Sequence, residues 1–78
     1  MDPNANLREQ LELARNLLAL DAEKKRLRRL GKTSEFIEIL RQGRRDAARL
    51  AELVEALDGW MTAGGALPTR WVAPWARP

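Results

Sequence analysis

The sequence of 78 residues contains neither cysteine nor histidine. Without cysteine the chain forms no disulfide and has no thiolate chemistry, and without histidine it lacks the usual general base and the commonest metal ligand. Ser34 is the only serine, and no histidine is present to activate it. We therefore expect the protein not to be an enzyme and to bind no cofactor and no metal.

Long apolar runs are also absent. No stretch approaches the roughly 20 apolar residues that span a bilayer. Asp2, Pro3 and Asn4 follow the first residue, where a signal peptide would carry its basic region. Hydrophobic residues make up 45% and charged residues 32% of the chain, which is typical of a folded protein in water. We expect no membrane partner.

The charges are unevenly distributed along the chain. The net charge is +3, but residues 24–45 hold nine basic residues and two acidic ones. This basic middle therefore carries +7 and leaves −4 for the rest of the chain. Such an asymmetry could face an acidic partner.

The first half of the chain predicts one helix from about residue 3 to 30. Asp2 can cap it, Pro3 suits its first turn, and Gly31 ends it, while Asn6 with Glu9 is a second candidate cap. Its apolar residues form two adjacent stripes, which are typical of a helix buried against more than one neighbour. The stripes are Leu7, Leu11, Ala14 and Leu18, and Leu13, Leu17, Leu20, Leu27 and Leu30. Asp21 interrupts the pattern, which leaves two alternatives open there, a kink in the helix or a second helix cap.

The second half predicts a helix from about residue 34 to 63, capped by Thr33 or Ser34 and ended by the pair Gly64-Gly65. Apolar and small residues alternate at spacings of four and three over nearly four heptads, which indicates a coiled-coil seam. The seam consists of Phe36, Leu40, Gly43, Ala47, Leu50, Val54, Leu57 and Met61. Because Gly43 is small, we expect a close approach of the neighbouring helix there.

Residues 66–78 predict an extended arm, since three prolines prevent a regular helix. Exposed indoles are unfavourable. We therefore expect Leu67 and Trp71 to pack back on the end of the second helix and the start of the first. Trp75 either follows them or stays available for a partner.

The turn at residues 31–33 is short, so the two helices are expected to be antiparallel neighbours. The predicted fold is all-α: an antiparallel two-helix hairpin over residues 1–65 with a heptad seam, followed by the extended Trp/Pro arm. A lone hairpin of this size buries little apolar area, and its apolar width exceeds what one helix covers. We expect a homodimer that forms a four-helix bundle, unless the arm covers the spare face and leaves a monomer.

Basic residues gather at the predicted tip of the hairpin and along the outer face of the second helix. One interpretation is a solvated tip in which Arg28 and Arg29 come near Glu35 and Glu38. The other is a surface that contacts phosphates without reading bases. The candidate phosphate contacts are Lys25, Arg28, Arg29, Lys32, Arg41 and Arg45.

Residues 2–11, DPNANLREQL, and residues 50–61, LAELVEALDGWM, stand at the two ends of the chain, and Gly64-Gly65-Ala66-Leu67-Pro68 and Trp71 follow the second segment. Together they resemble a group of small helical proteins encoded by actinobacteriophages and their hosts. The resemblance implies a phage-type protein in the cytoplasm of a bacterial host and brings no catalytic residue. Residues 21–49 depart from the group, as does Ala66, where an aromatic residue is expected.

We therefore expect a non-enzymatic, phage-type interaction protein that binds a host or virion protein through its helical surface and its arm. Arginine and tryptophan are favoured at interfaces, and the predicted seam does not need those on the outer face and in the arm. The expected contact residues are Arg41, Arg45, Arg49 and Trp75. The alternative is a basic protein that binds nucleic acid without sequence specificity, through the cluster between Lys24 and Arg49.

Overall fold

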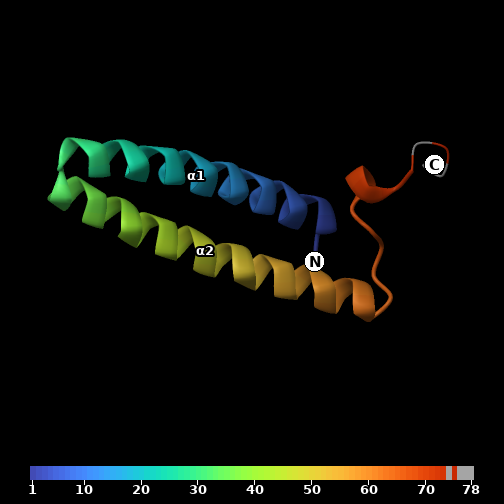
Figure 1. Cartoon of the computed structure of the whole chain (residues 1–78). Coiled ribbons are helices and arrows are strands. Elements are labelled where there is room, and N and C mark those ends of the chain that lie inside the picture. The colour runs from blue at the N-terminus through green and yellow to red at the C-terminus, as the bar shows by residue number, and fades with distance from the viewer. Residues whose placement is uncertain (74, 76–78) are drawn as a thin grey trace.

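The computed structural model describes residues 1–73 and 75 and shows two long antiparallel helices joined by a tight turn (Figure 1). Helix α1 spans Pro3–Leu30, helix α2 spans Thr33–Thr62, and a short 3-10 helix, η1, spans Thr69–Trp71. The two long helices lie side by side along their length, which confirms the all-α helical hairpin. Residues 74 and 76–78, at the end of the expected arm, lie outside the described residues.

Helix α1 begins and ends where local sequence features indicate. The Asp2 carboxylate accepts hydrogen bonds from the backbone N–H groups of Asn4, at 2.9 Å, and Ala5, at 3.2 Å. Gly31 adopts a left-handed conformation with φ of 71°, and its N–H donates to the Arg28 carbonyl. The helix continues through Asp21, so it neither breaks nor is capped anew at that residue.

Helix α2 begins one residue earlier than expected and has no side-chain cap. Its N-cap is Lys32, which makes no capping hydrogen bond through its side chain, so the expectation of a Thr33 or Ser34 cap is wrong. The physical reason is the length of the turn. In the turn at Gly31, the Lys32 N–H donates to the Leu27 carbonyl, and Thr33 is already the first helical residue. Neither Thr33 nor Ser34 is therefore at the capping position.

The core lies between the two helices and is small. Leu27 of α1 and Leu57 of α2 are almost fully buried, at 1% and 2% exposure, and Leu7 and Leu53 are also buried. The half-buried side chains of α2 that continue this row are Phe36, Ile39, Leu50 and Trp60. The buried side of α2 therefore keeps the seam residues Phe36, Gly43, Leu50, Leu57 and Met61 and adds Ile39, Leu53 and Trp60, which lie outside the predicted seam.

Three members of the predicted seam are exposed, so their assignment to the hairpin core is wrong. Leu40, Ala47 and Val54 lie on the flank of α2, with Leu40 and Val54 exposed by 42% and 48%. Ile39 and Leu53 face α1 in their place. These two side chains present a larger apolar surface to α1 than Leu40, Ala47 and Val54 would, because Ala47 is small. Burial of the bulkier row removes more apolar area from water.

Gly43 faces α1 without a crowded contact. A Cβ atom built on Gly43 would lie 4.0 Å from Cδ1 of Leu20, which is an ordinary van der Waals distance. The expected close approach of the helices therefore does not require glycine at this position.

The segment after α2 doubles back to the start of α1. Gly64 has φ of 92°, and the Gly65 N–H donates to the Trp60 carbonyl at 2.8 Å. The Trp60 indole N–H then donates to the Ala66 carbonyl, also at 2.8 Å. A Cβ atom on Gly65 would overlap the Trp60 ring, so this turn requires glycine.

The arm reaches α1 through Pro68 and Thr69. Pro68 is buried, the Thr69 N–H donates to the Asn4 side-chain oxygen at 2.7 Å, and the Asn4 amide donates to the Thr69 hydroxyl at 3.2 Å. Leu67 and Trp71, the residues expected to make this contact, are about half exposed. The described part of the arm is not fully extended, because η1 forms a single turn within it (Figure 1).

Neither helix within residues 1–73 has an apolar stretch long enough to cross a membrane.

Candidate interaction surfaces

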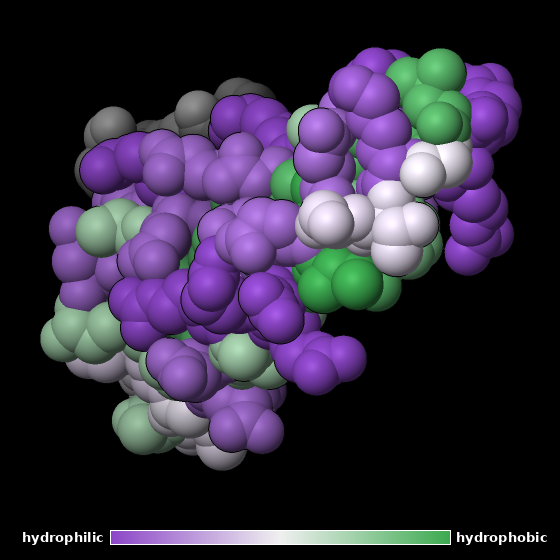
Figure 2. Space-filling view, turned by 90° about the vertical axis from the view of Figure 1, so that its left-hand side faces the viewer, coloured by the Kyte–Doolittle hydropathy of each residue, from purple (hydrophilic) through white to green (hydrophobic). Residues whose placement is uncertain are grey.

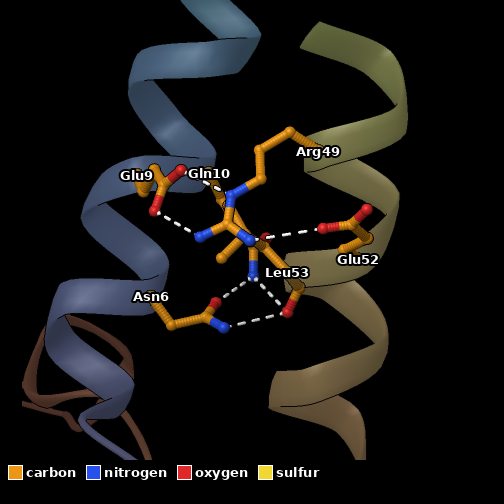
Figure 3. Close-up of polar contacts among 6 residues, drawn as sticks. All are labelled: Asn6, Glu9, Gln10, Arg49, Glu52 and Leu53. Carbon is orange, nitrogen blue, oxygen red and sulfur yellow. Dashed lines mark hydrogen bonds and ion pairs between the residues drawn. The ribbon is translucent and has the colours of Figure 1, made fainter. Parts of the chain in front are cut away.

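A polar cluster joins the two helices near the open end of the hairpin (Figure 3). The Asn6 amide donates a hydrogen bond of 3.0 Å to the Leu53 carbonyl. The Gln10 amide donates to the Asn6 side-chain oxygen at 2.6 Å and approaches the same carbonyl at 3.5 Å. Asn6 is only 7% exposed, and these bonds satisfy its amide inside the core.

Asn6, which with Glu9 is a second candidate cap by sequence, is therefore not a cap but a buried residue inside α1. A signal was nevertheless present, because the stripe of Leu13, Leu17 and Leu20 continues backward at the same spacing through Gln10 to Asn6. Polar residues at these positions of an apolar stripe indicate a buried hydrogen-bonded pair rather than a cap.

Arg49 lies beside this cluster and binds acidic residues of both helices (Figure 3). Its Nε and Nη2 atoms lie 2.8 Å and 3.1 Å from the two carboxylate oxygens of Glu9, and its Nη1 atom lies 3.3 Å from Glu52. The hydrogen bonds from Arg49 hold the pKa of Glu9 below its usual value, and those to Glu9 and Glu52 raise the pKa of Arg49. Arg49, expected as a partner contact, is thus engaged in holding α1 to α2.

Arg41 and Arg45 lie on the outer face of α2 and remain largely exposed. Each has an oxygen of Glu38 nearby, at 3.6 Å from Arg41 and 3.8 Å from Arg45, and Arg45 also donates to Gln42 at 2.7 Å. Together with Arg44 they border a shallow hollow of about 370 Å³ above Ala48. No ion pair of Arg44 is present among the described residues. The hollow is therefore basic and open to an acidic group.

The other candidate phosphate contacts are mostly engaged at the tip. Lys25 lies 3.1 Å from Asp21, Lys32 lies 3.9 Å from Glu35, and the Arg28 guanidinium sits 5.5 Å from the centre of the Phe36 ring. Within the described part of the chain, Arg29 makes no ion pair.

The expected pairing of Arg28 and Arg29 with Glu35 and Glu38 is wrong. Neighbours on α2 itself and in the turn occupy both carboxylates, namely Lys32 on Glu35 and the two outer arginines on Glu38. Residues three or four positions apart on one helix meet more readily than residues on two helices.

An exposed apolar surface lies on the flank opposite Arg49. Leu18 and Leu40 are each nine residues from Glu9 and Arg49, which is two and a half helical turns, so they point away from that ion pair. Leu18 is 73% exposed. We call this surface the lateral face; its exposed members are Leu18, Ile37, Leu40, Ala47, Ala51 and Val54, and the half-buried Leu11 continues it on α1.

The tip of the hairpin is mostly hydrophilic. Figure 2 looks along the hairpin from residues 24–45, where hydrophilic residues cover most of the visible surface. The most hydrophobic residues that reach the surface there gather on one flank.

The arm carries a further exposed apolar group. Trp75 is 89% exposed, and Trp71 and Leu67 are about half exposed. An indole that leaves nearly all its surface in water is available to a partner, since tryptophan contributes strongly when an interface covers it.

No set of three acidic side chains within residues 1–73 and 75 could hold a metal ion. A comparison with known protein families, curated proteins and solved structures finds no match to this chain.

Proposed function

We propose that this chain is a small, non-enzymatic interaction protein of the phage type that its two ends resemble. It acts as a homodimer and binds a host or virion protein in the bacterial cytoplasm through its outer helical surface and its arm. The observation that carries this proposal is the exposure of Trp75, at 89%, in a chain that leaves more large apolar side chains exposed than it buries.

Arg41 and Arg45 of α2 are the helical contacts in this proposal, together with Trp75 in the arm. Support comes from the basic hollow that Arg41, Arg44 and Arg45 border, which suits an acidic side chain of a partner. Arg49 is a positioning residue here, because Glu9 and Glu52 occupy its guanidinium.

Binding to nucleic acid is the competing function. Arg29 and Arg44 could contact phosphates, but Lys25, Lys32, Arg41 and Arg45 lie beside carboxylates. Binding to the phosphate backbone relies on many unpaired positive charges, and these carboxylates already neutralise four of the six candidate contacts, whereas the exposed Trp75 is an anchor of the kind that protein interfaces bury, so a protein partner is favoured.

The experiment compares capture by the wild type and by Trp75→Ala from nuclease-treated lysate of an actinobacterial host. We expect one protein to be retained by the wild type at 0.5 M salt and lost with Trp75→Ala. Arg26→Ala is the matched control, because Arg26 is exposed and its described ion pair is with Glu23 on the same helix.

A different result would support nucleic-acid binding. In that case random duplex DNA would be retained at low salt, with a log–log salt slope of roughly −0.9 per phosphate neutralised. Arg41→Glu with Arg45→Glu would abolish that retention, and Trp75→Ala would leave it unchanged.

A further inference from the structure

The lateral face is too large and too apolar to be left in water. Leu18, Ile37, Leu40 and Val54 are exposed by 42% to 73% on one flank of a hairpin whose smallest dimension is 14 Å. That thickness corresponds to one layer of helices, whereas stable domains bury an apolar face against a second layer.

The chain exposes more surface than a compact monomer of its mass does. A compact monomer of 8.9 kDa exposes about 4,800 Å² by the usual scaling of area with mass. This chain exposes 5838 Å², an excess of about 1,000 Å². A standard protein interface buries about 800 Å² on each partner, so the excess is large enough for contact with a second copy of the chain.

The charges of α2 are arranged symmetrically about its middle. The centre of this symmetry is the peptide bond between Arg49 and Leu50. Arg44 and Glu55 lie at equal distances before and after it, and so do Arg41 and Asp58. These four residues border the α2 part of the lateral face, because they occupy the same helical rows as Ile37, Ala51 and their neighbours.

We propose that two copies of this chain associate through their lateral faces, with the two α2 helices antiparallel and the two-fold axis at the middle of α2. This inference rests on the self-association in the proposed function and specifies its face and register. Arg41 and Arg44 of each copy lie within a turn of Asp58 and Glu55 of the other. The dimer therefore takes up Arg41, and of the two helical contacts in the proposed function Arg45 is the one left free for a host or virion protein. The contact is self-complementary, as a two-fold interface must be.

The centre of the same face is lined by small residues. Ala47 and Ala51 flank the proposed axis, and their size allows the two α2 helices to approach closely. Ile37, Leu40 and Val54 lie to either side and fill the contact. The Arg49–Glu9 ion pair stays on the opposite flank and is not part of the interface.

The experiment measures molar mass by light scattering during gel filtration at about 50 µM chain. Two charge-reversed proteins are prepared, Arg41→Asp with Arg44→Glu, and Glu55→Arg with Asp58→Arg. We expect a dimer for the wild type and a monomer for each reversed protein alone, because the border of the face then carries one sign of charge. An equimolar mixture should form a dimer again, since every pair across the axis is once more of opposite sign.

The matched control is Arg26→Glu with Arg45→Glu, which changes the net charge by the same amount as the acidic protein but lies away from the lateral face. We expect it to remain dimeric. Val54→Glu places a charge on the half-exposed apolar part of the face and should raise the dimer dissociation constant at least tenfold without unfolding the helices, as far-UV circular dichroism would report.

The outcomes separate this inference from the proposed function. A dimer that persists in both charge-reversed proteins would overturn the register while leaving self-association intact. A monomeric wild type would overturn the inference and the homodimer together, whereas the capture that depends on Trp75 tests the partner-binding function independently.

Discussion

The Asn6 side chain of α1 donates a hydrogen bond of 3.0 Å to the main-chain carbonyl of Leu53 in α2. The bond sets the register of the two antiparallel helices. Residues that follow Asn6 on α1 lie opposite residues that precede Leu53 on α2. Arg49 meets Glu9 one turn away in the same alignment.

Asn6→Ala should lower the free energy of unfolding by about 1–2 kcal/mol, since it removes a buried hydrogen bond and leaves Gln10 without its partner. Asn16→Ala is the matched control on the exposed face of α1, where alanine should stabilise the helix slightly. Urea denaturation monitored by circular dichroism gives both values. Equal effects of the two substitutions would contradict a structural role for Asn6.

Stability should fall in acid partly through Glu9. The pKa of Glu9 is lowered in the folded protein by the hydrogen bonds from Arg49, so the unfolded chain binds this proton more readily. The contribution of Glu9 is therefore present at neutral pH and is lost as the pH falls below about 4.3, the usual glutamate value, through the folded pKa.

Glu9→Gln tests that contribution. The melting temperature of this variant should be lower than that of the wild type at pH 7 and should approach it near pH 3. Glu12→Gln, on the same helix at an exposed position without a described ion pair, serves for comparison. If the difference in melting temperature between Glu9→Gln and the wild type stayed constant from pH 7 to pH 3, the titration of Glu9 would not contribute to the loss of stability in acid.

Gly43→Ala should stabilise the protein by up to about 1 kcal/mol, because alanine is the better helix former and its methyl group meets Leu20 at an ordinary distance. Gly59→Ala, where nothing lies within 4 Å of the new Cβ atom, should give a similar gain. Thermal melts of both variants check this. A loss of stability at Gly43 alone would show that the helices need glycine there.

Truncation after Gly65 should lower the melting temperature. It removes the Ala66 carbonyl that accepts from Trp60, the buried Pro68 and the Thr69 contacts with Asn4. Truncation after Val72 keeps all of these groups and should melt close to the full chain. Identical melting curves for the two truncated proteins would mean that the return of the arm contributes nothing to stability.

The ends of the helices could be predicted from the sequence because they depend on neighbours within a few residues. Asp2 and Pro3 start α1, Gly31 stops it, and Gly64-Gly65 follows α2 by two residues. Each of these signals acts through a local backbone conformation or a local hydrogen bond. The antiparallel hairpin follows from the brevity of the turn between the two helices.

Which side of each helix is buried was decided only by the tertiary structure. Helix α2 carries adjacent apolar rows, and the sequence periodicity alone does not say which of them meets α1. The choice depends on the partner surface, where the bulk of Leu53 and Ile39 outweighs the row of Leu40, Ala47 and Val54, and where Asn6 finds the Leu53 carbonyl. The same rotation turns Arg49 toward Glu9 and leaves the displaced row exposed, because a helix that buries one flank must present the other.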